Sequence, residues 1–357
     1  MFRTSQQALR AGGILAGAAV VAAMAFAGPA SAAHGSEFAG PTHPFGGHKY
    51  LTKEAHAGAA ARPNRNNLSY GGGVDGIGVT TGSPKVYVIF WGSQWGSAST
   101  DANGYTVLSG DPKGMAPRLQ AMYRGLGTNG ELWSGVMTQY CEGIAAGSQT
   151  CGSSNPHVAY PSSTVLAGVW VDTSVTAPSN ATARQIGDEA VKAAGHFGNT
   201  TATLNRNAQY VVVSPTGTHP DGFNTSSGNF CAWHDYNGDP YVGSPSSYGD
   251  IAFTNAPYVT DMGTSCGQNY VNSGSAGTLD GVTIVMGHEY AETITDQNPA
   301  GGWTDSRGSE NADKCSWNGT GGTGGSQNVA FATGSFAMQG TWANDTGDCR
   351  ISHAIVS

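Results

Sequence analysis

The segment PKVYVIFWG at residues 84–92 decides the fold class, because it is the first stretch with strong strand character. Its β-branched and aromatic residues form a continuous run that a glycine ends, which is typical of a strand buried on both faces. Similar runs at residues 165–171 and 209–214 predict two more strands. Between these runs, apolar residues recur at helical spacing over residues 117–130 and 182–197. The alternation of strand and helix predicts βαβ units and a sheet that is at least partly parallel.

Further strands are expected at residues 230–236 and 251–254, and the tail from residue 331 onward is expected to form one or two closing strands. A helix is expected from residues 278–280, which supply its N-cap, to residue 295, where Pro299 and the glycines after it prevent continuation. The 54 Gly residues indicate a loop-rich chain. We therefore expect an α+β protein, or one with an α/β core, in which helices flank a mixed sheet.

The N-terminus has the pattern of a secretory signal peptide. Arg3 and Arg10 precede a small apolar segment at residues 13–27, and the small residues at 30–32 suit cleavage after Ala32. No later stretch has about 18 apolar residues in succession, so we expect no membrane span in the mature protein. These features predict a secreted, extracellular protein.

This pattern divides the chain into three parts. We expect residues 1–32 to be the signal peptide, residues 33–81 a flexible leader or a propeptide, and residues 82–357 a single domain. As a propeptide, residues 33–81 would occupy the active site until removed, for example through one of their four histidines. Loss of the two signal-peptide Arg changes the formal charge from −8 to −10, which argues against nucleic acid as a partner. A monomer is expected.

All six cysteines lie in the expected mature part, and an even number in an exported chain indicates disulfides. Six cysteines allow 15 pairings, and the sequence does not choose among them. We favour the pairing of neighbours along the chain, which joins Cys141 to Cys151, Cys231 to Cys266 and Cys315 to Cys349. No pair has zinc-finger spacing, so a structural thiolate zinc site is not expected.

The catalytic chemistry is concentrated at residues 287–315, GHEYAETITDQNPAGGWTDSRGSENADKC. His288 and Glu292 are four positions apart and share one face of a helix, so both can bind one metal ion. This is the HExxH metallopeptidase pattern with its second histidine replaced by glutamate. Glu289 is then placed to act as the general base toward a water that attacks a peptide carbonyl.

A zinc hydrolase needs a third protein ligand, and the acidic residues after the helix can supply it. We expect Glu310 to be this ligand, with Asp305 as the alternative, and Asp313 to orient His288 through its free ring nitrogen. His234 has three possible roles. It is a fourth ligand, a group that stabilises the oxyanion or protonates the leaving amine, or a structural histidine. The expected cofactor is Zn²⁺.

Several motifs together resemble a known family. They are PKVYVIFWGSQW at residues 84–95, ELWSGVMTQY at 131–140, QYVVV at 209–213, FCAWHDY at 230–236 and the segment 287–315. From about residue 84 to the C-terminus, the chain resembles the phosphate-induced protein, or EXORDIUM-like, family of exported proteins. An HElaE…P…W…EiaDlC pattern in the plant members has counterparts here in Glu292, Trp303, Glu310, Asp313 and Cys315. A family Phe-Cys-x-x-His motif corresponds to His234. The resemblance implies a secreted fold with a metal-site-like motif, in a family described as growth-signalling proteins.

Two other functions compete with hydrolysis. In a non-catalytic extracellular signalling or binding protein, the acidic cluster would hold a structural ion, and Ca²⁺ would favour its carboxylates over His288. A carbohydrate-active or wall-binding protein would use the 8 Trp and 14 Tyr, but no spacing indicates paired catalytic carboxylates. Glu289 separates hydrolysis from a structural ion site, which needs no base. We therefore expect a secreted zinc-dependent peptidase that acts on an extracellular peptide or protein, with the non-catalytic protein as the alternative.

Overall fold

The computed structural model describes residues 49–55 and 67–356. In this part of the chain, the main sheet has six strands in the order β1-β8-β9-β7-β3-β6. They are β1 (Lys49–Leu51), β3 (Lys85–Trp91), β6 (Leu166–Asp172), β7 (Ala208–Val213), β8 (Phe230–Tyr236) and β9 (Ala252–Ala256). The neighbouring strands β9, β7, β3 and β6 are parallel to one another. β8 is antiparallel to β9, and β1 is antiparallel to β8. The α+β class with a mixed sheet is confirmed.

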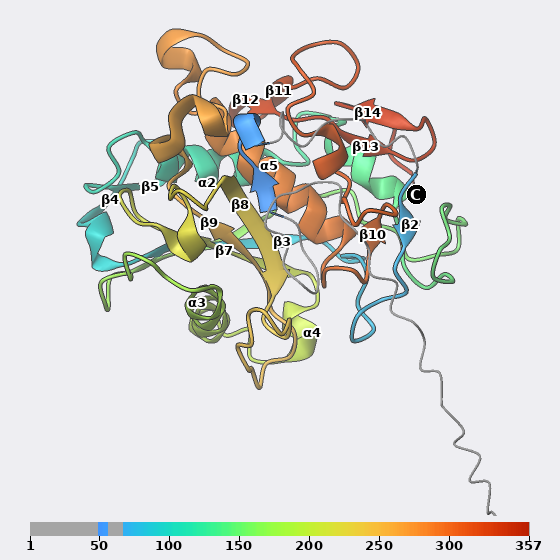
Figure 1. The fold of residues 1–357 in the computed structure, drawn as a ribbon, viewed down its shortest axis with the longest axis horizontal. Coiled ribbons are helices and arrows are strands. Elements are labelled where there is room, and N and C mark those ends of the chain that lie inside the picture. The colour runs from blue at the N-terminus through green and yellow to red at the C-terminus, as the bar shows by residue number, and fades with distance from the viewer. Residues whose placement is uncertain (1–48, 56–66, 357) are drawn as a thin grey trace, which may run out of the picture. The chain divides into compact units, whose positions relative to one another are not determined.

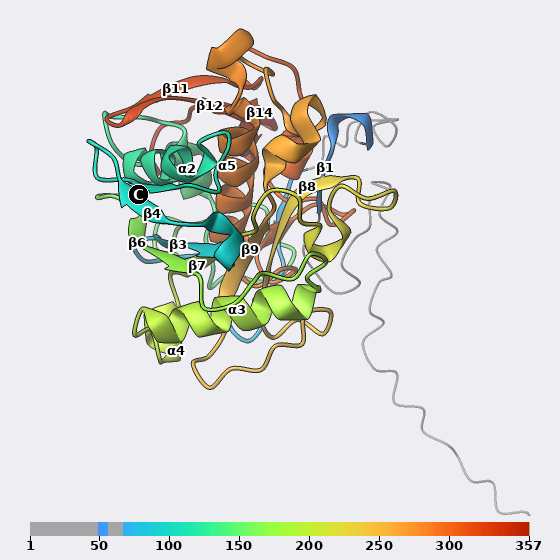
Figure 2. The same cartoon turned by 90° about the vertical axis from the view of Figure 1, so that its left-hand side faces the viewer.

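Helices cover both faces of this sheet (Figure 1). Figure 2 shows α3 (Ala183–His196) and the short α4 (Ala202–Asn205) on one face, and α2 (Met115–Gly125) and α5 (Asp280–Thr295) on the other. α3 begins with a capping box, in which Thr182 Oγ1 accepts the N–H of Gln185 and the Gln185 side chain accepts the N–H of Thr182. The predicted βαβ units are therefore present, and they leave α5 packed against β8 and β9.

The remaining strands form two-stranded sheets. They pair as β10 (Trp303–Thr304) with β2 (Ser69–Tyr70), β11 (Gln327–Phe331) with β12 (Gly334–Met338), β13 (Thr341–Ala343) with β14 (Asp348–Arg350), and β4 (Ala98–Thr100) with β5 (Thr106–Leu108). Short 3₁₀ helices lie at Ser93–Trp95, Ser134–Gln139, Pro220–Gly222, Val259–Cys266, Gly274–Gly277 and Asp313–Cys315. The tail after residue 331 thus forms β12, β13 and β14, where we expected one or two strands.

The start of α2 differs from the prediction because a nearby carboxylate binds backbone amides, whereas α5 starts where expected. Asp111 accepts the N–H groups of Met115 and Ala116, so α2 begins two residues before the predicted start. α5 begins within the expected residues 278–280, with Leu279 at the N-cap position, although no side chain caps the helix there. The Asp280 carboxylate instead accepts backbone N–H groups of the preceding loop, at residues 271 and 272.

Three disulfides join cysteines that are neighbours along the chain, and the favoured pairing is confirmed. They are Cys141–Cys151, Cys231–Cys266 and Cys315–Cys349. Disulfides of this kind are typical of proteins in oxidising compartments. Within residues 49–55 and 67–356, we find no helix with the length and apolar character of a membrane span.

The folded domain begins before residue 82, where we expected its boundary. β1 joins the main sheet, and β2 pairs with β10. Leu68 and Val79 are fully buried, so residues 67–81 are part of the folded domain and are not a flexible leader. The expected signal peptide at residues 1–32 and the four histidines of the expected leader lie outside the described residues.

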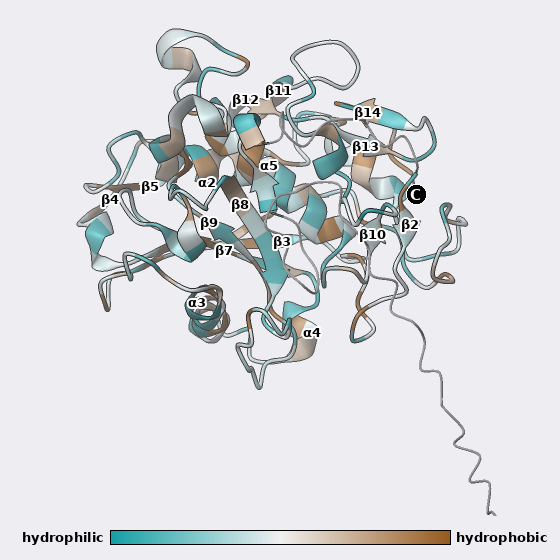
Figure 3. Cartoon of the chain, viewed as in Figure 1, coloured by the Kyte–Doolittle hydropathy of each residue, from teal (hydrophilic) through white to brown (hydrophobic). Residues whose placement is uncertain are grey.

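α5 is buried along its whole length of 16 residues. A helix buried on all sides is normally apolar all round, yet Figure 3 shows hydrophilic turns along α5. Its buried polar residues include His288, Glu289 and Glu292. Glycine allows the close packing near its start, because a Cβ atom on Gly281 would lie 2.0 Å from the carbonyl oxygen of Cys266. Tertiary packing therefore places three ionisable side chains where water does not reach them.

Candidate metal centre

One turn of α5 carries the residues of the HExxE motif. His288 Nε2 lies 2.9 Å from Glu292 Oε1, as expected for positions i and i+4 on one helix face. Both side chains and that of Glu289 are fully buried. The predicted motif helix is confirmed, and its two candidate ligands face the same point.

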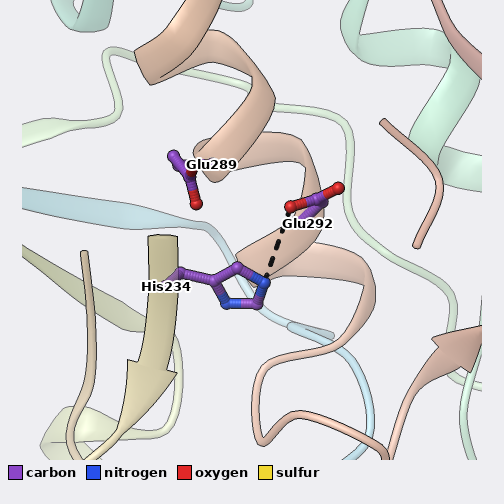
Figure 4. A group of neighbouring side chains, drawn as sticks. All are labelled: His234, Glu289 and Glu292. Carbon is purple, nitrogen blue, oxygen red and sulfur yellow. Dashed lines mark ion pairs between the residues drawn. The ribbon is translucent and has the colours of Figure 1, made fainter. Parts of the chain in front are cut away.

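His234 reaches this point from the sheet. It lies on β8 opposite Thr254 of β9, and its ring is directed toward Glu292 on α5 (Figure 4). Its Nε2 is 3.8 Å from Glu292 Oε2 and 3.1 and 3.2 Å from the two carboxylate oxygens of Glu310. Because a carboxylate oxygen accepts a hydrogen bond, Nε2 carries a proton in these contacts. His234 is thus a hydrogen-bond donor directed into the cluster.

The loop after α5 adds two carboxylates, with roles other than those we expected. Asp313 Oδ1 lies 3.6 Å from His288 Nε2, and its backbone N–H donates to Glu292 Oε1 over 2.9 Å. Glu310, which we expected to be the third ligand, pairs with His234 instead. Asp313 therefore lies on the side of His288 that faces Glu292, where a third ligand would be needed.

Asp305, the alternative third ligand, is held in its own loop. Its Oδ1 accepts the backbone N–H groups of Arg307 and Ser309, and its Oδ2 is 3.3 Å from Lys314 Nζ. None of these contacts is with a histidine. The geometry favours Asp313 over Asp305 as a ligand.

Gln339 is a site residue that the sequence analysis missed. Its Nε2 donates to the Ala312 carbonyl over 2.6 Å, which fixes the orientation of the amide. Its Oε1 faces His288 Nδ1 at 3.4 Å, and because this oxygen only accepts, Nδ1 carries the proton. We expected Asp313 to orient His288 from this side, but Gln339 does so. No signal in the sequence marks Gln339, which lies 51 positions after His288.

Among the described residues, two groups of three His, Asp or Glu side chains have their potential ligand atoms within 4.8 Å of one another. One contains His288, Glu292 and Asp313, and the other contains His234, Glu289 and Glu292. Ligand atoms around a tetrahedral Zn²⁺ lie about 3.4 Å apart, given bonds of about 2.1 Å. In the first group, the His288 Nε2 distances of 2.9 Å and 3.6 Å lie on either side of that value. Since the proton of the His288 ring is on Nδ1, its Nε2 and the carboxylate oxygen beside it are both hydrogen-bond acceptors. Two acceptors this close repel each other, and a cation bound to both makes the contact favourable.

The electrostatics of the cluster also favour a bound cation. Burial raises the pKa of Glu289 and of Glu292 well above the usual range, and the nearby carboxylates Asp313 and Glu310 raise both further. Burial lowers the pKa of His234, which reduces its ability to supply a compensating positive charge. The charged neighbours that act on the two glutamates are themselves carboxylates. A divalent cation would supply the positive charge that the ionised forms of these two glutamates need.

Glu289 lies beside this ligand set without a hydrogen bond of its own. Neither of its carboxylate oxygens has a hydrogen-bond partner among the described residues. Figure 4 shows Glu289 and Glu292 extending from the same helix toward His234. A buried polar group without a partner costs about 1–3 kcal/mol, and a bound ion, a water molecule or a catalytic role can account for one. Glu289 is therefore a candidate functional group beside the side chains that could hold a metal ion.

Comparison with known proteins gives this chain no assignment. No family model, no curated protein and no solved structure matches it. The chemistry of the centre therefore has to be argued from its own geometry.

Proposed function

We propose that this protein is a secreted zinc-dependent hydrolase that cleaves peptide bonds. The observation that carries the proposal is the ligand set of the buried His288 and Glu292 with the half-buried Asp313, beside which Glu289 makes no hydrogen bond. Three protein ligands that leave one position open are typical of catalytic zinc sites, whereas structural sites are closed by four. The imidazole nitrogen and the short distances between ligands favour Zn²⁺ over Ca²⁺.

The surrounding residues suit the steps of peptide hydrolysis. A bound Zn²⁺ supplies Lewis acidity toward water and toward the scissile carbonyl. Glu289 takes a proton from the attacking water as the water oxygen bonds to the carbonyl carbon. The Nε2–H of His234, which donates to Glu310 in this structure, would leave that carboxylate and donate to the oxyanion that forms. The proton then passes from Glu289 to the leaving amine as the C–N bond breaks.

The proposal also covers where the protein acts and which family it belongs to. The signal-peptide pattern of residues 1–32 and the three disulfides fit an extracellular protein. We also propose that the chain is an EXORDIUM-like protein, because Glu292, Glu310 and Asp313 are among the residues that carry the resemblance. Hydrolysis itself is supported by the site chemistry and not by the resemblance.

A non-catalytic extracellular protein with a structural ion is the second candidate. The complete burial of His288, Glu289 and Glu292 favours it, because a substrate cannot touch these side chains in the fold described. The two functions differ in their need for Glu289, which a structural ion site does not use.

Metal content and hydrolysis together test the proposal. Mass spectrometry of the purified protein should find about one zinc per chain, which Glu292→Gln and Asp313→Asn lose. Glu131→Gln is the matched control, because Glu131 is a buried carboxylate that accepts backbone N–H groups and contacts no histidine in the described structure. Glu289→Gln should retain zinc and lose at least about 100-fold in peptide hydrolysis. A zinc-free wild-type protein, or a Glu289→Gln variant as active as wild type, would refute the hydrolase.

A further inference from the structure

The segment of residues 49–55 begins with β1 (Lys49–Leu51), which adds an outer strand to the main sheet beside the candidate metal centre. β1 pairs antiparallel with β8, with Tyr50 opposite Ala232, and the N–H of Thr52 donates to the Asn229 carbonyl over 3.1 Å. Figure 2 shows β1 beside β8 at the edge of the sheet. Without this segment, β8 would be the edge strand and would offer its backbone hydrogen-bonding groups to another extended chain.

Tyr50 covers the metal centre directly. It lies opposite Ala232, two positions before His234, so these side chains share the face of the sheet toward α5. The Tyr50 ring is fully buried and stacks on His288, with ring centroids 3.8 Å apart. Its hydroxyl donates over 2.7 Å to Gln339 Oε1, the oxygen that also faces His288 Nδ1. The complete burial of His288 thus includes the contribution of a segment that is not part of the ligand loops.

The residue before Tyr50 is recognised on the other face of the strand. Lys49 is buried, forms an ion pair with Asp221, and has its Nζ 4.4 Å from the centroid of the Phe230 ring. The contacts therefore combine backbone pairing, a pocket for an aromatic side chain and an acidic partner for a basic one. Peptide-binding sheet edges use this combination, in which the backbone supplies affinity and alternate side chains supply specificity.

We propose that the edge of β8 is a peptide-binding groove leading to the metal centre, and that residues 49–55 occupy it in place of a substrate. The groove takes an extended peptide antiparallel to β8, with a basic residue toward Asp221 and an aromatic residue over His288. This assignment of the substrate class rests on the proposed hydrolase function, whereas peptide binding does not. Because the segment is tethered, it competes at an effective concentration on the order of millimolar, and the centre stays closed until the segment leaves.

The test uses the full chain with the recognition sequence of a specific protease placed within residues 56–66, cut after folding. A fluorescent peptide with the sequence of residues 49–55, KYLTKEA, is titrated by anisotropy into the intact and the cut chain after dialysis. The cut chain should bind the peptide saturably and the intact chain should not. A Tyr50→Ala peptide should bind at least about tenfold more weakly. A Glu54→Ala peptide should bind like the parent, because Glu54 is exposed in the chain.

The binding and hydrolysis results separate the groove from the hydrolase. Equal binding to intact and cut chains, or equal affinity of the Tyr50→Ala peptide, would overturn the groove. A rise in peptide hydrolysis on cutting, abolished by Glu289→Gln, supports both proposals. Specific binding without hydrolysis leaves the groove standing and refutes the hydrolase, and hydrolysis without peptide binding refutes the groove. If circular dichroism shows that the cut chain unfolds, the intact Tyr50→Ala chain replaces it with the same expectations.

Discussion

Glu292→Gln should change stability in opposite directions in the metal-free and the zinc-loaded protein. Glu292 is fully buried, with its Oε1 2.9 Å from His288 Nε2 and accepting the N–H of Asp313. Glutamine has the same shape and can keep the bond to the Asp313 amide, but it carries no charge. Burial and neighbouring carboxylates raise the pKa of Glu292, so the charged form is unfavourable without a cation. In the metal-free protein we expect the substitution to be neutral or to stabilise the fold by about 1 kcal/mol.

In the zinc-loaded protein, the same substitution should lower the stability. A ligand at 100 times its Kd stabilises the folded protein by about 2.7 kcal/mol. The variant lacks an anionic ligand, so it should gain less than about 1 kcal/mol at the same zinc concentration. For a domain of this size, 1 kcal/mol corresponds to about 2–4 °C in Tm. Zinc should therefore raise the wild-type Tm by about 5–10 °C and that of Glu292→Gln by less than about 4 °C.

Scanning calorimetry after chelator dialysis, with and without added zinc, measures both effects. Glu131→Gln is again the control, and it should lower the Tm equally in both conditions because Glu131 accepts backbone N–H groups of Gly127 and Ser134. If Glu292→Gln lowers the Tm of the metal-free protein by more than about 5 °C, the carboxylate is a structural hydrogen-bond acceptor. Repulsion between the buried carboxylates then does not destabilise the metal-free fold. The same conclusion follows if zinc raises the Tm of wild type and variant equally.

Two further predictions concern the scaffold. Burial raises the pKa of Glu189 to about 8, so between its ordinary value of 4.5 and 8 the folded state keeps a proton that the unfolded state releases, and stability falls as the pH rises. Glu189→Gln should abolish this loss, on the order of 3 kcal/mol, in urea unfolding at pH 5 and pH 9, and an unchanged slope would contradict it. Replacing the Cys315–Cys349 disulfide, which spans 34 residues, by two serines should cost about 3–4 kcal/mol. It should also weaken zinc binding in calorimetric titration, because Asp313 lies two residues before Cys315, and an unchanged zinc affinity would show that other contacts hold the loop.

The strands and helices of the main sheet could be predicted because their signals are local. The apolar run of β3 and the amphipathic pattern of α3, with its capping box at Thr182, depend on residues close together in the chain. The start of the domain could not be predicted in this way. β1 and β2 are short, and each becomes a strand only by pairing with a partner more than 150 residues away, β8 or β10.

In the candidate metal centre, too, local spacing was predictable and contacts between distant segments were not. That His288 and Glu292 share a helix face could be read from their spacing, because helical geometry fixes the relation between positions i and i+4. Only the tertiary structure decided that Asp313 approaches His288 Nε2 while Glu310 pairs with His234. It also placed Gln339 and Tyr50 against the His288 ring. These residues reach the helix through loops and an added strand, whose paths are set by packing between distant segments and leave no periodic signal in the sequence.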